Sequence, residues 1–332
     1  MVDLQAVIRS NTSLSRVNGP HVALFVGATS GIGLGILKEF TRSSANPRVY
    51  IVARNAAVAA SIVDELRRLN SSAIFEIIEK DVSLIKDAEK VAEYVKAKES
   101  SLDLLCMSVG FFSLDGRKVA LDTTEGLEAS LTTRFYSRIR ITQLLLPLLN
   151  QSQSPHVLSI LAGGKEGPIH EDDLGLDRPE NFYVSSANTQ TATMMTLALE
   201  HLASENPRIS FVHAFPGLVA TPLMTRISSG IRGVLIRYLV APVLSFFVRS
   251  VSEAGQRGLF TATSARYSVD DGIVPLAGGL QKVERSKGGV FLIDENGEAP
   301  DNEKVLEDLR KRGVDKKVWD HTMEVFADVS SG

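Results

Sequence analysis

The chain contains a single cysteine among its 332 residues. One cysteine forms no internal disulfide and builds no thiolate metal site, so the composition fits the reducing cytoplasm. The six histidines are scattered, with no spacing that predicts a metal centre. Basic residues show no excess, because 36 Lys and Arg stand against 39 Asp and Glu. Nucleic acid is therefore not an expected partner, since phosphate binding needs clustered basic side chains.

Long apolar runs are also lacking. The longest run outside the predicted strands covers residues 234–248, is interrupted by Arg237 and Pro242, and is too short to cross a bilayer. No integral membrane segment is therefore expected. The first 20 residues have no continuous apolar core, which argues against a secretory signal. We interpret residues 1–20 as a loose N-terminal extension before the fold.

What the sequence does contain is an alternation of short apolar runs with longer segments of helical periodicity. The predicted strands are 21–26, 48–53, 73–78, 102–109, 156–161, 209–215 and 289–294. The main predicted helices are 32–41, 56–69, 85–98, 124–149 and 183–203. This pattern predicts an α/β fold, a doubly wound parallel sheet of about seven strands with helices on both faces. No linker or repeat divides the chain, so residues 21–332 are expected to form a single domain.

A glycine-rich turn directly follows the first predicted strand, with the spacing G-x-x-x-G-x-G. Glycines at a strand-to-helix turn let the backbone approach a pyrophosphate, and the free N–H groups at the helix start hold its charge. The motif resembles that of the short-chain dehydrogenase/reductase superfamily, which implies a Rossmann fold and a dinucleotide site. The residues expected to hold the dinucleotide here are Gly27, Thr29, Ser30, Gly31, Ile32 and Gly33.

Residues after the second and third strands indicate which dinucleotide is bound. Arg54 and Asn55 follow the second strand, and no Asp or Glu stands there to accept the ribose hydroxyls of NAD. A guanidinium suits a 2′-phosphate, so NADP(H) is the expected cofactor; Arg54 also fits an ordinary solvated arginine. Asp81 and Val82 close the third strand and resemble the superfamily's adenine contact, although an Asp after a strand is also a common helix cap.

Two further segments match the order of the superfamily. Its N-N-A-G segment after the fourth strand corresponds to residues 107–110, in which only Gly110 is retained. The segment after the sixth strand resembles its P-G-x-x-x-T loop, which implies that Pro216, Val219 and Thr221 lie against the nicotinamide end. The resemblance covers roughly residues 22–221.

The catalytic group of the superfamily is a Ser, a Tyr and a Lys, with an Asn nearby. The resemblance implies that Tyr183 exchanges a proton with the substrate oxygen. Ala162 stands where the Ser belongs, so Ser159, three residues earlier on the strand, becomes the candidate hydroxyl. Ala187 stands where the Lys belongs, and Arg134 where the Asn is usual. The dinucleotide half of the pattern is therefore retained and the catalytic half is altered.

Three charged residues are candidates to replace the missing groups. Lys165 and Glu166 follow Ala162, where Lys165 can supply the lost positive charge and Glu166 can act as an acid or base; both also fit solvated loop charges. We predict that Lys165 joins the catalytic group. Arg134 stands within a predicted helix, and a buried arginine needs a partner such as the cofactor diphosphate, a carboxylate or the substrate. We assign Arg134 to the cofactor site; a surface arginine with a buried stem is the alternative.

Residues 222–288 are rich in Leu, Ile, Val and Phe and are predicted to form a substrate lid, which favours a bulky apolar small molecule; packing in a homo-oligomer also fits. The chain is similar to atypical superfamily members associated with fungal secondary metabolism, which implies an NADPH-dependent oxidoreductase. Carbonyl reduction is favoured over alcohol oxidation, because a protonated tyrosine only has to donate. A non-redox isomerase, cyclase or dehydratase, or a non-catalytic nucleotide-binding protein, stays open.

Overall fold

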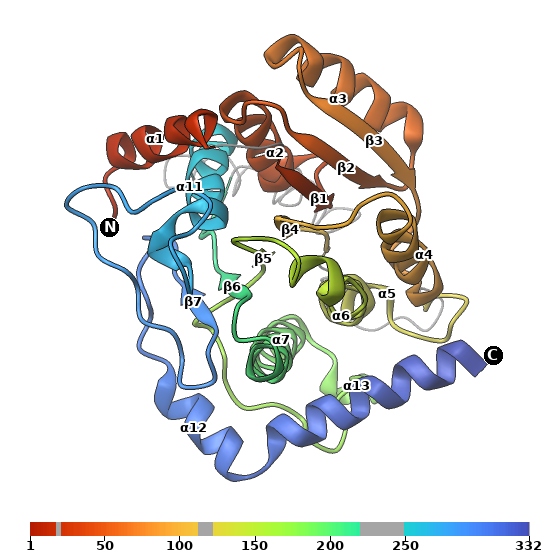
Figure 1. The fold of residues 1–332 in the computed structure, drawn as a ribbon. Coiled ribbons are helices and arrows are strands. Elements are labelled where there is room, and N and C mark those ends of the chain that lie inside the picture. Colours follow the sequence, from red (N-terminus) through yellow and green to blue (C-terminus); the bar gives the residue numbers. More distant parts are fainter. Residues whose placement is uncertain (18–20, 112–121, 220–248, 332) are drawn as a thin grey trace, which may run out of the picture.

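The computed structural model of the chain describes residues 1–17, 21–111, 122–219 and 249–331. Seven strands in this described part form one parallel sheet, in the order β3-β2-β1-β4-β5-β6-β7 (Figure 1). Each overlaps one predicted strand, which confirms the doubly wound sheet. The strands are β1 (Val22–Val26), β2 (Arg48–Ala53), β3 (Ile74–Glu79), β4 (Leu104–Met107), β5 (His156–Ile160), β6 (Ser210–Ala214) and β7 (Phe291–Ile293).

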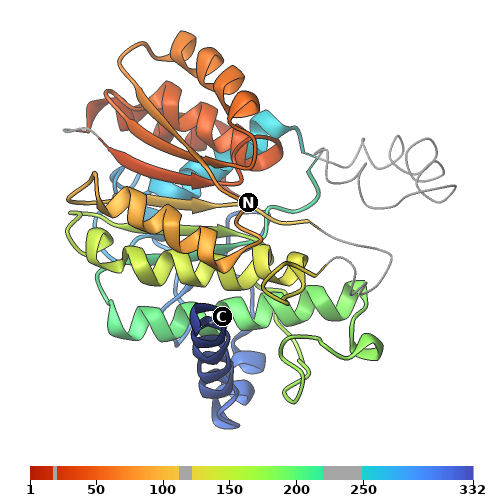
Figure 2. The ribbon, with the colours of Figure 1, turned by 90° about the vertical axis from the view of Figure 1, so that its right-hand side faces the viewer.

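Helices cover both faces of the sheet, as predicted. One face carries α1 (Leu4–Ser13), α2 (Gly31–Ser43), α3 (Ala56–Leu69) and α11 (Val251–Thr263). The other carries α4 (Ile85–Lys96), α6 (Ser137–Leu149) and α7 (Val184–Glu205), and Figure 2 shows α6 and α7 running side by side. A separate apolar core fills each interface between sheet and helices. The central strands are buried on both sides, which explains why they read as continuous apolar runs.

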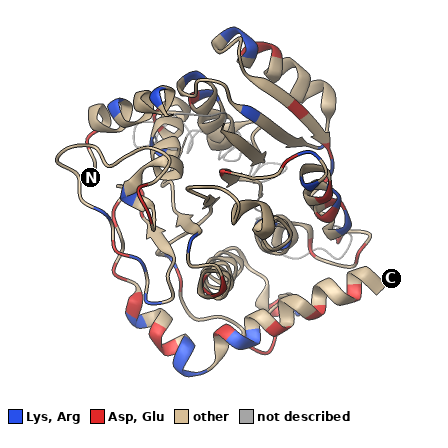
Figure 3. Ribbon diagram, in the orientation of Figure 1, with Lys and Arg blue, Asp and Glu red and all other residues tan. Residues whose placement is uncertain are grey.

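The C-terminal residues add an outer layer. α12 (Glu303–Lys311) leads into α13 (Val314–Ser331), which crosses the outer side of α7 (Figure 1). The rings of His201 and Trp319 stack with their centroids 3.8 Å apart, which fixes α13 to α7. Because sheet and α13 enclose α7 between them, most of its residues are buried, and charged residues lie instead on α12 and α13 (Figure 3).

The N-terminal residues are a docked helix and not a loose extension. Asp3 caps α1, because its carboxylate accepts the Ala6 N–H at 3.0 Å. Val7 is buried, and the Asn11 side chain donates to the Gln256 side chain on α11 at 2.7 Å. The expectation for this segment was wrong because its apolar residues are few and find their partner about 245 residues later in the chain.

The long helix predicted over residues 124–149 begins later and is not regular. Its first turn is α5 (Ala129–Leu131), followed by a π-helical turn at Thr132–Tyr136 and then by α6. The Glu125 carboxylate instead accepts the N–H groups of Ile85 and Lys86 at the start of α4. A π-helical turn inserts an extra residue into the helix, and such turns are frequent at functional sites.

Short 3₁₀ turns complete the described structure, at Leu14–Arg16, Pro179–Asn181 and Ala265–Tyr267. Thr221 and the part of the predicted lid over residues 222–248 lie outside the described residues. In the remainder of that range, α11 packs against α2 as a covering helix. Among the described helices, none is both long and apolar enough to span a membrane.

Candidate active site

A cavity of about 540 Å³ opens at the carboxyl ends of β1 to β5. Strand order reverses between β1 and β4, and this switch point is where open α/β sheets bind ligands. Most of the residues predicted to hold a dinucleotide meet around this cavity. From that set it is lined by Gly27, Thr29, Ser30, Gly31, Ile32, Gly33, Arg54, Asp81, Val82 and Gly110.

Glycines in the turn allow it to pack closely against the segment after β4. Gly27 has a φ of +91°, and a Cβ there would lie 2.3 Å from the backbone nitrogen of Val109. A Cβ on Gly33 would lie 2.1 Å from Oγ of Ser108. Gly31 begins α2 with a φ of +58°. The start of α2 therefore exposes backbone N–H groups to the cavity, an arrangement that fits a pyrophosphate.

The other end of the cavity carries two cations. Arg54 follows β2 and Lys80 follows β3, and both line the cavity. Asn55 lies beside this end without lining it, because its side chain caps α3 by accepting the Val58 N–H at 3.1 Å. Glu79 accepts the Ala56 N–H at 2.9 Å. The oxygens of Asn55 and Glu79 thus serve the start of α3, whereas Asp81 is a carboxylate that lines the cavity.

The structure separates Ser159 from Tyr183. Tyr183 is the residue before α7, and 53% of it is exposed. Ser159 is fully buried within β5, where its hydroxyl accepts a hydrogen bond from Arg138 Nη1 at 2.8 Å. A buried hydroxyl with this partner is not placed to bind a substrate. The assignment of Ser159 as the substitute serine is therefore corrected to a structural role.

Lys165 contacts the loop after β6. Its Nζ lies 4.8 Å from the centre of the Phe215 ring, a cation–π contact with the residue after β6. Its backbone N–H donates to Ala162 in a tight turn. The Lys165 cation therefore lies against the loop after β6, and its assignment to the catalytic group stays a prediction.

Glu166 is neither a solvated loop charge nor an accessible acid. Its side chain is fully buried, and its carboxylate accepts hydrogen bonds from the Thr196 hydroxyl at 2.6 Å, the Gly164 N–H at 3.1 Å and the Asn302 side chain. His213 lies 2.8 Å from the same Thr196 hydroxyl. These bonds hold the loop after β5 against α7, β6 and the start of α12.

His213 links this network to Ala162. Its Nε2 accepts the Ala162 N–H at 3.1 Å, so Nδ1 carries the proton and donates to Thr196. Burial, with the nearby Arg138 charge, lowers the pKa of His213 to about 3. The ring is therefore neutral in the folded protein at neutral pH.

This burial makes stability depend on pH. Since the folded pKa of His213 lies below its unfolded value, stability is complete above about pH 6.5 and falls as the pH drops toward 3. Between pH 6.5 and pH 5, His213 alone removes about 2 kcal/mol from the free energy of unfolding. Chemical denaturation at several pH values should show this slope flattened in His213→Gln and unchanged in His201→Gln. Equal slopes in wild type and His213→Gln would contradict the assignment.

Two buried arginines lie behind the cavity wall. Arg134 is 2% exposed, which excludes the surface alternative, and its Nη2 donates to Oδ1 of Asn188 and Oγ1 of Thr191, both at 2.7 Å. Burial lowers its pKa to about 10. A Cβ on Gly110 would lie 2.9 Å from Cγ of Arg134, so the guanidinium stem contacts the cavity wall at that glycine.

Arg138 is the residue that sequence reasoning missed. It is 1% exposed, and each of its hydrogen bonds within the described residues goes to a neutral oxygen. The acceptors are the carbonyls of Thr133, Met107, Ile160 and Val109 and the hydroxyl of Ser159. Burial and the neighbouring Arg134 lower its pKa to about 9. The available signal was the spacing of Arg134 and Arg138, four residues apart in the predicted helix.

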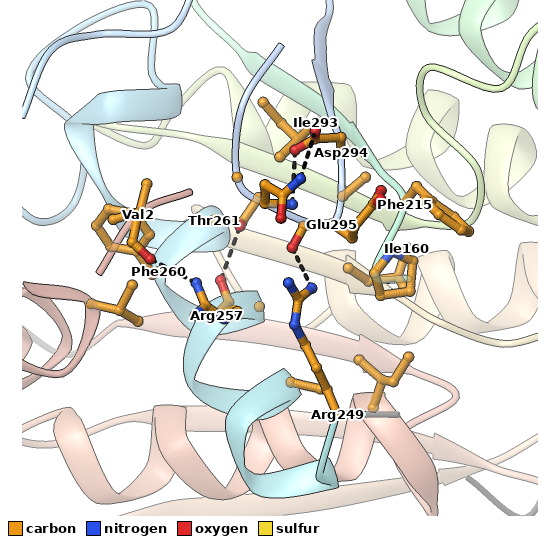
Figure 4. A pocket seen from close by; sticks show the side chains of 18 of the residues that line it. Val2, Ile160, Phe215, Arg249, Arg257, Phe260, Thr261, Ile293, Asp294 and Glu295 are labelled. Carbon is orange, nitrogen blue, oxygen red and sulfur yellow. Dashed lines mark hydrogen bonds between the residues drawn. The ribbon is translucent and has the colours of Figure 1, made fainter. Parts of the chain in front are cut away.

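The loop after β6 lies at a second, smaller cavity of about 40 Å³ (Figure 4). Pro216 lines it, together with Ile32 and Ile160, which also line the larger cavity. Figure 4 shows Arg249 pointing to the backbone of Glu295, and Arg257 bonded to the carbonyl of Val2 at 2.9 Å. The N-terminal segment thus closes this side of the site.

Val219 is 4% exposed and pairs with Arg249 in an isolated bridge, while Arg134 lies behind the wall and not on it. Of these loop residues, Pro216 lines the smaller cavity and Val219 lines neither. In the described ranges, no group of three or more His, Cys, Asp or Glu side chains could hold a metal ion.

A family model described as short chain dehydrogenase matches residues 21–232. The chain belongs to this family. It is 44% identical to the NmrA-like family domain-containing oxidoreductase notO of an Aspergillus species, over 99% of this chain and 96% of the relative. It is 30% identical to the short-chain dehydrogenase/reductase SAT2 of Stachybotrys chartarum, over 98% of this chain and 97% of the relative. It is thus an oxidoreductase of short-chain dehydrogenase type.

Solved structures of this family share the fold. The Pseudomonas aeruginosa RhlG/NADP active-site complex superposes with a TM-score of 0.56 at 19% identity, over 80% of this chain and 98% of that one. The L-sorbose reductase of Gluconobacter frateurii, complexed with NADPH and L-sorbose, gives 0.56 at 16% identity, over 75% and 91%. At these identities the likeness shows the seven-stranded Rossmann architecture.

Proposed function

We propose that this short-chain dehydrogenase reduces a carbonyl group on a bulky apolar metabolite with NADPH, and that Tyr183 donates the proton. The observation that carries the proposal is the cavity at the switch point, where the glycine turn and the two cations Arg54 and Lys80 face the same space. The solved relatives named above as NADP and NADPH complexes support the choice of cofactor.

NADP(H) fits this cavity better than NAD(H). A 2′-phosphate is doubly charged, and Arg54 and Lys80 offer it two cations from adjacent strand ends. Lys80 lies 4.0 Å from Asp87, a distance that leaves the ammonium room to turn toward a ligand. The Glu79 carboxylate, at the end of β3, serves the start of α3.

NADPH supplies a hydride when bound. The residues of this chain would bind the cofactor, orient the substrate and protonate its carbonyl oxygen. The backbone at Gly31–Gly33 and the start of α2 would hold the diphosphate. The Tyr183 hydroxyl would donate its proton to the oxygen of the carbonyl as that oxygen becomes an alkoxide, a step that needs a donor and no auxiliary base.

Apolar side chains at the rim of the site favour an apolar substrate. Phe111 follows β4 and lines the cavity, Tyr183 precedes α7, and Leu218 follows β6, so all three lie at the carboxyl edge of the sheet. Their exposed fractions are 37%, 53% and 56%, respectively. Large exposed apolar groups at the sheet edge that carries a cavity are typical of a ligand surface.

A titration of the purified protein with NADPH, followed by incubation with a panel of apolar ketones, tests the proposal. Saturable binding and substrate-dependent oxidation of NADPH are expected. Failure to bind NADPH would refute the proposed function. Conversion of a substrate without net oxidation of NADPH would instead favour a non-redox isomerase, cyclase or dehydratase, which the alanines at positions 162 and 187 favour as the second candidate.

The cofactor preference gives a separate prediction. Arg54→Ala should raise the dissociation constant for NADPH about 10-fold, because a charge-assisted hydrogen bond to the 2′-phosphate is lost. The dissociation constant for NADH should stay within about 2-fold, since NADH lacks that phosphate. Arg67→Ala is the matched control, because Arg67 lies on the exposed side of α3 and pairs with Asp64 at 3.4 Å. Equal losses of affinity for NADPH and NADH would show that Arg54 does not bind the 2′-phosphate.

A further inference from the structure

A cation from another segment bonds the residues next to the position that lacks a lysine. Ala187 lies one turn into α7, and its N–H donates to the carbonyl of Tyr183. Its own carbonyl accepts the Thr191 hydroxyl at 2.7 Å. Arg134 Nη2 donates to that same Thr191 hydroxyl and to Asn188. The guanidinium therefore lies against α7 next to Ala187.

The π-helical turn carries Arg134 to this place. Arg134 is the central residue of the turn, and the residue after the turn begins the regular part of α6. The extra residue in such a turn changes the direction of the side chains before it relative to those after it. Gly110 permits the approach, because any Cβ there would lie 2.9 Å from Cγ of Arg134.

Solvent screens the charge of Arg134 only weakly. Arg134 is only 2% exposed, and at low dielectric a cation acts on neighbouring charge more strongly than in water. Of the described charged groups, Glu128 and Arg138 face it electrostatically. The Glu128 carboxylate accepts the Leu131 N–H at 2.6 Å and so serves the start of α5.

We propose that Arg134 supplies, from the π-helical turn before α6, the positive charge that the family's lysine supplies from α7. This inference rests on the proposed reductase function and assigns Arg134 as a positioning residue. Its guanidinium holds Asn188 and Thr191, and thus the first turns of α7 that carry Tyr183, and it stabilises negative charge that develops on oxygen at that end of the cavity. Ala187 is then small because a lysine there would bring a second cation to the same place.

Substitutions at Arg134 and Ala187 test this proposal. Arg134→Gln keeps a hydrogen-bond donor for Asn188 and removes the charge, whereas Arg134→Lys keeps the charge. We expect Arg134→Gln to lower kcat for carbonyl reduction about 10²-fold and to weaken NADPH binding, and Arg134→Lys to retain most of both. The double variant Arg134→Asn with Ala187→Lys should recover at least 10-fold in kcat over Arg134→Asn alone. Arg140→Gln, on the outer side of α6, is the control.

NADPH binding by titration and thermal unfolding without cofactor are measured on every variant. A purely structural role predicts that Gln and Lys variants lose melting temperature and rate together, and that Ala187→Lys recovers nothing; that result would overturn the proposal. Wild-type kcat in Arg134→Gln would overturn it as well. If Arg134→Gln does not fold, Arg134→Lys and the double variant decide, because both keep a cation. Wild-type protein without NADPH binding would instead refute the reductase function itself.

Discussion

Tyr183→Phe should lower the rate of NADPH-dependent carbonyl reduction by about 10²–10⁴-fold, the range that a general acid contributes. The substitution removes one hydroxyl from a side chain that is 53% exposed, so the fold and the affinity for NADPH should be unchanged. Steady-state kinetics and a cofactor titration measure the two effects separately. The loss should appear in kcat, because proton donation belongs to the chemical step.

Tyr94→Phe is the matched control, because Tyr94 is 37% exposed on α4 and its hydroxyl bonds Glu76 at 2.8 Å, away from the cavity. It should keep the wild-type rate. The same assays fix the direction of the reaction, since at neutral pH ketone reduction should exceed alcohol oxidation. Faster oxidation than reduction, or an undiminished rate in Tyr183→Phe, would remove Tyr183 as the proton donor.

The sheet was predictable because its signals are local. Strands buried on both faces must be apolar throughout, and a glycine turn between a strand and a helix has few other uses. For the same reason the residues of the glycine turn, Arg54, Asp81 and Gly110 could be placed together from their order after the strands. Parallel strands bring their carboxyl ends to one edge whatever the details of packing.

The altered catalytic half was not predictable in the same way, because its contacts join distant segments. Glu166 was expected to be a loop charge, but the side chain of Asn302, 136 residues later, donates a hydrogen bond to it. Ser159 was expected to be a candidate hydroxyl, but it accepts a hydrogen bond from the buried guanidinium of Arg138. Lys165 was expected to replace the missing lysine, and its cation lies over the ring of Phe215. In each case the side chain contacts a residue of another segment.

Arg138→Met should lower the free energy of unfolding by roughly 3–5 kcal/mol, because it removes a buried charged group together with its hydrogen bonds. Met has a similar length and no donors, so the carbonyls of Met107, Val109 and Ile160 lose a partner in the interior. These carbonyls end β4 and β5, where the cavity wall begins. Chemical denaturation measures the stability, and NADPH affinity should fall with it.

The sign of this result is informative because two costs oppose each other. The guanidinium is fully buried beside Arg134, so its removal relieves desolvation and repulsion between like charges. Its five neutral acceptors lose their donors at the same time. Arg140→Met, from the same helix, removes a pair with Glu89 that is partly exposed and should cost about 1 kcal/mol or less. A variant Arg138→Met as stable as wild type would mean that desolvation outweighs the bonds, and that Arg138 is kept for its charge at the cavity wall.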